Sequence, residues 1–322
     1  MKKKTLTVLL AGCMVTAALA GCGANEEKTA QTGDLLETSA DSAAKTDEEL
    51  AAEVAALIDA IYVQQRTDET DEKCEAAKAA WDALTDEQKE LVEGEYADPD
   101  YFGLDTGDAS LDDPCNADDI GENEILVVSF GTSYNDSRVA DIKSVEDAIA
   151  EANPAWSVRR AFTAQIIINH IQARDGEKID NVEQALERAV SNGVKNLVVQ
   201  PTHLMHGAEY DELCDTLAQY EDKFETVSVA EPLLGEVGED ASVTNDDKTA
   251  VAEAITAAAT KEAGYESVSA AASDGVAFVF MGHGTSHTAK VTYSQMQTTA
   301  ADLGYENVFI GTVEGEPEET SC

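Results

Sequence analysis

The feature that most constrains the fold is a regular alternation of short apolar runs and helix-length segments from residue 123 onward. The apolar runs are continuous, which is typical of strands buried on both faces of a sheet. Strand, helix and strand in succession predict parallel pairing, because parallel neighbours need a crossover connection. We expect strands at 125–130, 158–163, 196–200 and 226–233, with helices near 138–152, 181–191 and 209–220.

The same rhythm restarts after a connecting helix predicted at 246–263, with a strand at 275–280, a helix near 288–303 and a strand at 307–313. The turn after the first strand of each unit carries a similar tetrapeptide, Phe130-Gly131-Thr132-Ser133 and then His283-Gly284-Thr285-Ser286. This match indicates a duplication, and therefore an α/β fold of two similar doubly wound parallel-sheet halves. By the spacing of the first unit, the third strand of the second would begin beyond Cys322, so we expect an incomplete second half and a truncated reading frame.

The N-terminus has the layout of a secretory signal. Lys2, Lys3 and Lys4 precede an apolar run at 6–20, which is too short to span a membrane. The run ends in Leu19-Ala20-Gly21-Cys22, which looks like a bacterial lipobox and implies cleavage before Cys22 and lipidation of its sulfur. Two acyl chains suffice for anchoring to the outer face of the cell membrane. The alternative is an ordinary signal peptide with a chance cysteine, and both readings predict export.

Composition divides the remaining chain. After the signal peptide at 1–21, residues 22–45 contain almost no large apolar side chain and are expected to form a flexible tether. Capping boxes and apolar stripes predict a small helical module at 46–94, which is either a spacer or a partner-binding surface. A loop-like linker at 95–122 leads to a first α/β half at 123–240 and a second at 241–322.

Charge and cysteine content exclude some functions. The 64 acidic residues outnumber the 21 basic ones, giving a formal net charge of −43, and no basic run follows residue 4. Nucleic acid is therefore not an expected partner. The six cysteines include no C-x-x-C pair and show no regular spacing, which argues against a thiolate metal site or a disulfide framework.

Two residues stand where a ligand would bind. Open parallel sheets bind ligands beyond the carboxyl ends of their strands, and His283 and Glu314 follow neighbouring strands of the second half. An imidazole and a carboxylate suit a divalent ion such as Co²⁺, Zn²⁺, Ni²⁺ or Fe²⁺. The alternative for His283 is a turn histidine bonded to the backbone.

Weaker candidates come from the first half. His203 and His206 could bind a metal or an iron porphyrin from the opposite wall, or could be loop histidines held by hydrogen bonds. Basic residues near the expected crevice could meet an acidic substrate or could be solvated surface charges; they are Arg138, Arg159, Arg160 and Lys290.

A set of short motifs in unbroken order resembles one family. They are Val127-Val128-Ser129-Phe130-Gly131-Thr132-Ser133, Arg160-Ala161-Phe162-Thr163, Gln200-Pro201-Thr202-His203, Pro232-Leu233-Leu234, Met281-Gly282-His283-Gly284 and Val313-Glu314-Gly315. Together they resemble the anaerobic sirohydrochlorin cobaltochelatases, a class II chelatase family, and their exported lipoprotein relatives. Each motif is weak alone, and the ordered set is specific.

The resemblance implies roles for individual residues. His283 would bind the metal and accept pyrrole protons as the catalytic residue, and Glu314 would be a further metal ligand, with a third expected beyond residue 322. By the same resemblance, weaker substrate contacts fall on Ser129, Thr132, Ser133, Arg160 and His203. Co²⁺ or another divalent metal is expected without a nucleotide cofactor, and the oligomeric state, a homo-oligomer included, stays open.

Three functions remain from the sequence. The first is an enzyme, a lyase of cobalamin biosynthesis that inserts Co²⁺ into a tetrapyrrole such as sirohydrochlorin. The second is a surface lipoprotein that binds or shuttles a metal or tetrapyrrole without turnover, which the exported location favours. The third is a generic periplasmic binding module, which would not place a ligand pair at matching strand ends.

Overall fold

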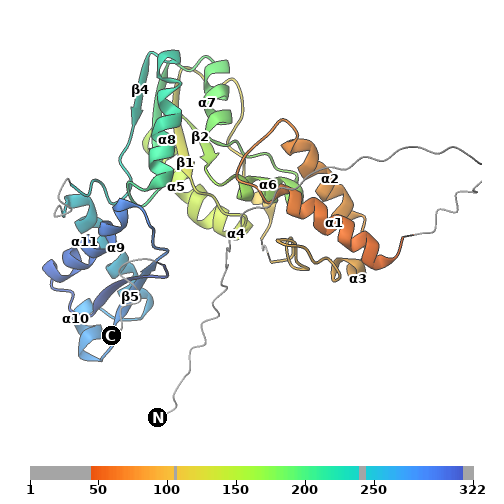
Figure 1. The fold of residues 1–322 in the computed structure, drawn as a ribbon. Coiled ribbons are helices and arrows are strands. Elements are labelled where there is room, and N and C mark those ends of the chain that lie inside the picture. Colours follow the sequence, from red (N-terminus) through yellow and green to blue (C-terminus); the bar gives the residue numbers. More distant parts are fainter. Residues whose placement is uncertain (1–44, 105–106, 239–243, 315–322) are drawn as a thin grey trace, which may run out of the picture. The chain divides into compact units, whose positions relative to one another are not determined.

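A small helical part comes first in the described residues. The computed structural model describes residues 45–104, 107–238 and 244–314. Helices α1 (Asp47–Ile61), α2 (Thr70–Asp82) and α3 (Asp86–Lys89) come first (Figure 1). The predicted capping boxes at Thr46 and Thr85 are both present, so each side chain caps the N–H of the third residue of its helix. Apolar side chains of α1 and α2, including Val54, Ile58 and Cys74, close a shared core.

The segment after α3 is more than a linker. It is irregular, as its composition predicts, apart from the 3₁₀ turn η1 (Ala109–Leu111). Tyr101 and Phe102 are nevertheless buried in the core of the helical part, where Phe102 meets the Trp81 ring edge-on at 5.0 Å. Tyr101 also stacks on His170 at 4.2 Å, which joins this segment to the first α/β half. The domain boundaries given above remain predictions.

The first sheet has four parallel strands in the order β2-β1-β3-β4 (Figure 1). They are β1 (Asn123–Ser129), β2 (Ser157–Phe162), β3 (Asn196–Pro201) and β4 (Thr226–Val229). The central strand β1 is buried from Glu124 to Ser129, and Leu126 and Val128 pack with Leu186 and Leu213 of the covering helices. The expected α/β class with a parallel sheet is thus confirmed.

Helical connections link these strands. Between β1 and β2 lie α4 (Asn135–Ser137), the π-helical turn η2 (Arg138–Lys143) and α5 (Ser144–Ala152). Between β2 and β3 lie α6 (Gln165–Asp175) and α7 (Val182–Ser191), and between β3 and β4 lie α8 (Ala208–Ala218) and η3 (Glu221–Lys223).

The second sheet consists of two parallel strands in the described residues, β5 (Phe278–Gly282) and β6 (Val308–Thr312). They follow α9 (Asp246–Glu262) and α10 (Val268–Ser273), and η4 (Thr288–Lys290) with α11 (Val291–Asp302) connects them. Ile310 of β6 lies in one apolar cluster with Met296 of α11, and Met205 and Leu234 of the first half join the same cluster. The second half therefore packs against the segments that follow β3 and β4.

The two units repeat the same backbone turn. In the first unit, Thr163 donates its N–H to Ser129 at 2.9 Å, and Ala164 donates to Phe130 at 3.2 Å. In the second, Val313 donates to Gly282 at 3.0 Å, and Glu314 donates to His283 at 2.9 Å. The next residue is a left-handed glycine in both, Gly131 at φ 100° and Gly284 at φ 90°. The expected duplication is present at this turn.

Three local expectations were incomplete. The sequence predicted neither α6 nor α10, and β4 ends at Val229 rather than at residue 233. Pro232 has no N–H to donate, which explains the early end of the regular ladder. Leu233 and Leu234 still donate to His203 and Leu204, both at 2.9 Å, so this segment follows the loop after β3.

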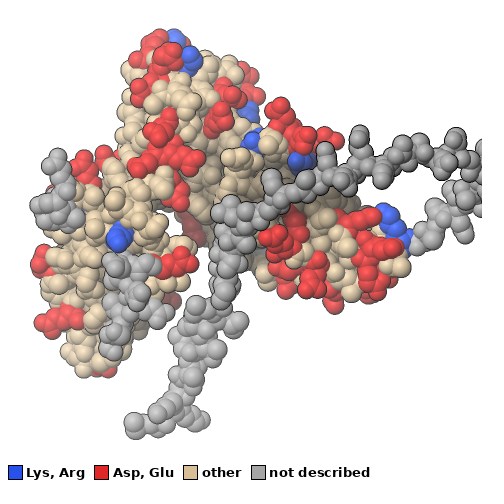
Figure 2. All heavy atoms as spheres, in the orientation of Figure 1, with Lys and Arg blue, Asp and Glu red and all other residues tan. Residues whose placement is uncertain are grey.

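Acidic side chains cover much of the surface in view, over the helical part and the helices of the first sheet (Figure 2). No helix among the described residues is both long and apolar enough to cross a membrane.

Candidate functional site

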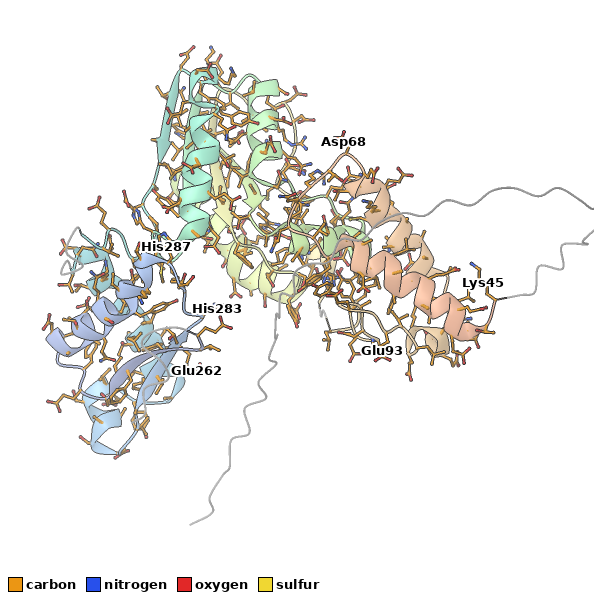
Figure 3. All side chains as sticks on the ribbon, viewed as in Figure 1. Lys45, Asp68, Glu93, Glu262, His283 and His287 are labelled. Carbon is orange, nitrogen blue, oxygen red and sulfur yellow. The ribbon has the colours of Figure 1, made fainter. Side chains whose placement is uncertain are left out.

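His283 stands at the carboxyl end of β5 and is exposed (Figure 3). Its Nδ1 lies 3.1 Å from the carbonyl oxygen of Gly284. A carbonyl oxygen can only accept, so Nδ1 carries the hydrogen and Nε2 of the neutral ring keeps its lone pair. Metal-binding histidines are oriented in this way by a backbone acceptor. This backbone contact is the one that the turn-histidine alternative predicts, and it also leaves the Nε2 lone pair available, so both readings of His283 remain open.

Glu314 follows β6 directly beside His283. Its N–H donates to the His283 carbonyl, and its exposed side chain leaves the neighbouring strand at the same edge of the sheet. Gly284 makes this approach possible, because a Cβ at that position would lie 1.5 Å from the carbonyl oxygen of Glu314. The two expected ligands are therefore sequence-distant neighbours held by the parallel register.

A cavity of about 510 Å³ connects the two halves at this edge. Its volume is in the range of small-molecule sites. His283, Gly284, Thr285 and Tyr293 line it from the second half. The first half contributes Phe130, Thr202, His203, Leu204, Met205, Gly207 and Glu209.

His203 brings a second imidazole to this cavity. Both of its ring nitrogens are buried and have no hydrogen-bond partner among the residues that the structure describes. Burial lowers the pKa of His203, which favours the neutral ring, and a neutral ring has one N–H and one lone pair. Unpartnered buried polar atoms are costly, and a bound ligand would satisfy them. Of the expected site residues, the cavity brings together His203 and His283.

Equivalent positions of the two halves carry chemically different side chains. The backbone positions of His283 and Glu314 correspond to Phe130 and Ala164 in the first half. Only the second half therefore places an imidazole and a carboxylate on this turn, while the first half places an aromatic ring and a methyl group there.

Sequence reasoning missed two polar residues of the cavity. The hydroxyl oxygen of Tyr293, on α11, accepts the Gly284 N–H at 3.1 Å, and its ring packs closely over Gly282. Glu209 lies in the first turn of α8 and lines the opposite wall. A helix that begins directly after a strand-end turn points its first residues at the same edge of the sheet, which is the signal that could have identified both.

Arg160 lies in a buried network of ion pairs. Its side chain is 0% exposed, and Nε, Nη1 and Nη2 are bonded to the carboxylates of Glu146 and Asp112 at 2.6–3.0 Å. Arg138 joins the same network through Asp112 at 2.8 Å. These guanidinium groups neutralise buried carboxylates, which is a structural role, and this burial argues against the expected substrate contact of Arg160.

The remaining candidates lie outside the lining of the cavity. Ser129 is buried, and its Oγ accepts from Thr202 at 2.9 Å. The Thr132 hydroxyl oxygen accepts a hydrogen bond from the N–H of Tyr134 in the same loop. The Ser133 carbonyl oxygen accepts one from Arg174. His206 pairs with Glu231 rather than with His203.

One further polar contact near the site joins the two halves. His287, on the loop after β5, pairs with Asp211 of α8 at 3.3 Å and so joins the two halves (Figure 3). The described residues contain no group of three His, Cys, Asp or Glu side chains arranged to hold a metal ion. A pair such as His283 and Glu314 would leave coordination positions open to a substrate. Cys22 lies outside the described residues.

Known proteins share this region. The family model described as Cobalt chelatase (CbiK) matches residues 123–321. A sirohydrochlorin cobaltochelatase of Salmonella typhimurium is 29% identical over 194 residues, which are 60% of this chain and 66% of that protein. The sirohydrochlorin cobaltochelatase CbiKC of Nitratidesulfovibrio vulgaris is 30% identical over 193 residues, which are 59% of this chain and 61% of that protein. The chain thus spans slightly less than two thirds of the length of each relative. With both sheets and the cavity inside the matched region, the chain belongs to the cobalt chelatase family.

Proposed function

We propose that this chain is a sirohydrochlorin cobaltochelatase, a lyase that inserts Co²⁺ into a tetrapyrrole during cobalamin biosynthesis. The observation that carries the proposal is His283, whose Nε2 lone pair is free beside Glu314 at the mouth of a cavity. The names of the two relatives support the choice of metal and tetrapyrrole.

Insertion needs a proton acceptor as well as a metal site. Two pyrrole N–H protons must leave as the metal arrives, and a neutral imidazole is suited to accept one. Nδ1–H is held by the Gly284 carbonyl, so Nε2 can hold either Co²⁺ or a proton, and it would accept one pyrrole proton after the metal has moved to the ring. The second pyrrole proton would leave to water. Glu314 supplies a negative charge that offsets the charge of the arriving cation.

The test is an insertion assay with the full chain, sirohydrochlorin and Co²⁺, followed by the absorbance of the metallated ring. The proposal requires metallation faster than in a protein-free reaction. Equal rates with and without protein, at concentrations where the protein binds the tetrapyrrole, would refute it.

We also propose that the protein is exported and anchored to the outer face of the cell membrane through lipidated Cys22. The support is the Leu19-Ala20-Gly21-Cys22 motif behind a basic and apolar N-terminus. Cys22→Ala should release the protein from the membrane fraction of its host, with the wild-type chain as control. Unchanged membrane retention of the variant would contradict lipidation at Cys22.

The same motif favours a second function, a surface lipoprotein that binds or carries a metal or tetrapyrrole without turnover. The two functions differ in one result. A carrier would bind sirohydrochlorin in the cavity while leaving the rate of metallation unchanged or lower, because a bound ring is shielded from metal in solution.

A further inference from the structure

The wall of the cavity contributed by the first half carries three apolar side chains, Phe130, Leu204 and Met205. Phe130 is 52% exposed and Leu204 is 47% exposed, and both line the cavity with Met205. Single exposed apolar residues are common on proteins, but grouped ones in a concave site indicate binding. These side chains need a partner with an extended apolar face.

The backbone holds Phe130 at a defined place in this wall. The Phe130 carbonyl accepts from Ala164, and Gly131 follows in the left-handed conformation at φ 100°. A Cβ on Gly131 would lie 2.6 Å from the ring of Phe162, which is fully buried under the turn. The turn therefore cannot shift inward, and Phe130 stays at the strand end as His283 does in the second half.

The charges of the residues that line the cavity limit the class of ligand that it can bind. The residues of the described chain that line this cavity include no lysine or arginine, and Glu209 adds a carboxylate. The wall is thus unsuited to bind substrate carboxylates. It suits the flat conjugated face of a macrocycle, because aromatic side chains stack on such faces.

From this arrangement we infer that Phe130 is the platform on which the tetrapyrrole ring stacks, an inference that rests on the proposed function. The two copies of one turn then have different tasks. Phe130 binds the plane of the ring, and His283 meets its metal and protons. The peripheral carboxylates of the ring point away from the lining residues.

The experiment measures sirohydrochlorin binding to the full chain by fluorescence titration, together with Co²⁺ binding and the thermal midpoint. Phe130→Ala should weaken tetrapyrrole binding about tenfold or more, since a stacked ring is lost. Phe130→Tyr keeps the ring and should bind within about threefold of wild type. Tyr134→Ala is the matched control, because Tyr134 is 45% exposed on the same loop but does not line the cavity.

The outcomes separate the two proposals. The platform role of Phe130 is supported if Phe130→Ala loses tetrapyrrole affinity while Phe130→Tyr and Tyr134→Ala keep it. Co²⁺ binding and the thermal midpoint of Phe130→Ala should be unchanged. Wild-type binding that Phe130→Ala leaves unchanged would overturn the platform while the proposed function stands. A wild-type chain that binds no sirohydrochlorin would overturn both.

Discussion

The main-chain N–H of Glu314 donates to the carbonyl oxygen of His283 at 2.9 Å, although the two residues are 31 positions apart in the sequence. Parallel pairing of β5 with β6 creates this contact, since Gly282 is in register with Thr312. Both expected metal ligands therefore start from the ends of two adjacent paired strands, and the geometry of the site depends on the backbone as much as on the side chains.

We predict that Gly284→Ala disrupts the site. The added Cβ would meet the Glu314 carbonyl oxygen at 1.5 Å, so the turn after β6 must move away from His283. Cobalt insertion should fall at least tenfold, because misplacement by about 1 Å can cost about 10²-fold in rate. Gly264→Ala is the control, since Gly264 also has a left-handed φ of 80° but no neighbour within 4 Å of an added Cβ. Equal activity of the two variants would show that the contact is unimportant.

We predict that Arg160 contributes to stability and not to substrate binding. Arg160→Met would leave the buried carboxylates of Asp112 and Glu146 without their shared cation. Breaking such a buried network costs about 3–5 kcal/mol of unfolding free energy, which denaturant titration measures. Lys178→Met is the control, because its contacts to Asp71 and Glu75 are at the surface and its removal should change little. A fully stable Arg160→Met with weakened tetrapyrrole binding would restore the substrate role.

We predict that acid weakens the junction between the helical part and α6. Burial lowers the pKa of His170 from 6.5 to about 4, so the unfolded chain takes up its proton first as the pH falls. The unfolding free energy therefore decreases between about pH 6.5 and pH 4, and from pH 7 to pH 5 this one group accounts for about 2 kcal/mol. His170→Phe keeps a ring against Tyr101 and should show a smaller decrease, measured by denaturant titration at both pH values. Identical pH dependence of wild type and variant would contradict this origin.

Much of the fold was predictable because the sheet is buried on both faces. Continuous apolar runs such as Ile125 to Val128 can hardly be anything other than central strands. Helix α6 was missed because two different neighbours cover it and erase the amphipathic period. Ile168 faces the sheet core, whereas Asn169 donates to the carbonyl of Ile61 at 2.9 Å and Gln172 donates to Asp71 at 3.0 Å. A sequence pattern cannot show that these polar side chains are buried against another part of the chain.

The candidate site, like the fold, was predictable only in part. The positions of His283 and Glu314 at adjacent strand ends were predictable because the strand ends of one sheet meet at one edge. The role of Arg160 was not, since its partner Asp112 lies 48 positions away in a segment that reads as a loop. Tyr293 was also missed, because its hydroxyl contact to Gly284 depends on how α11 packs over β5.

The most direct test of the account is the initial rate of cobalt insertion into sirohydrochlorin by the full chain and by His283→Ala. We predict that the wild-type chain exceeds the protein-free rate and that His283→Ala loses about 10² to 10⁴ of this acceleration, because one group acts as ligand and proton acceptor. Glu314→Gln should retain more activity than His283→Ala, since it keeps the shape of the side chain and loses only its charge. An unchanged rate in His283→Ala, with the protein folded and the tetrapyrrole bound, would contradict the account.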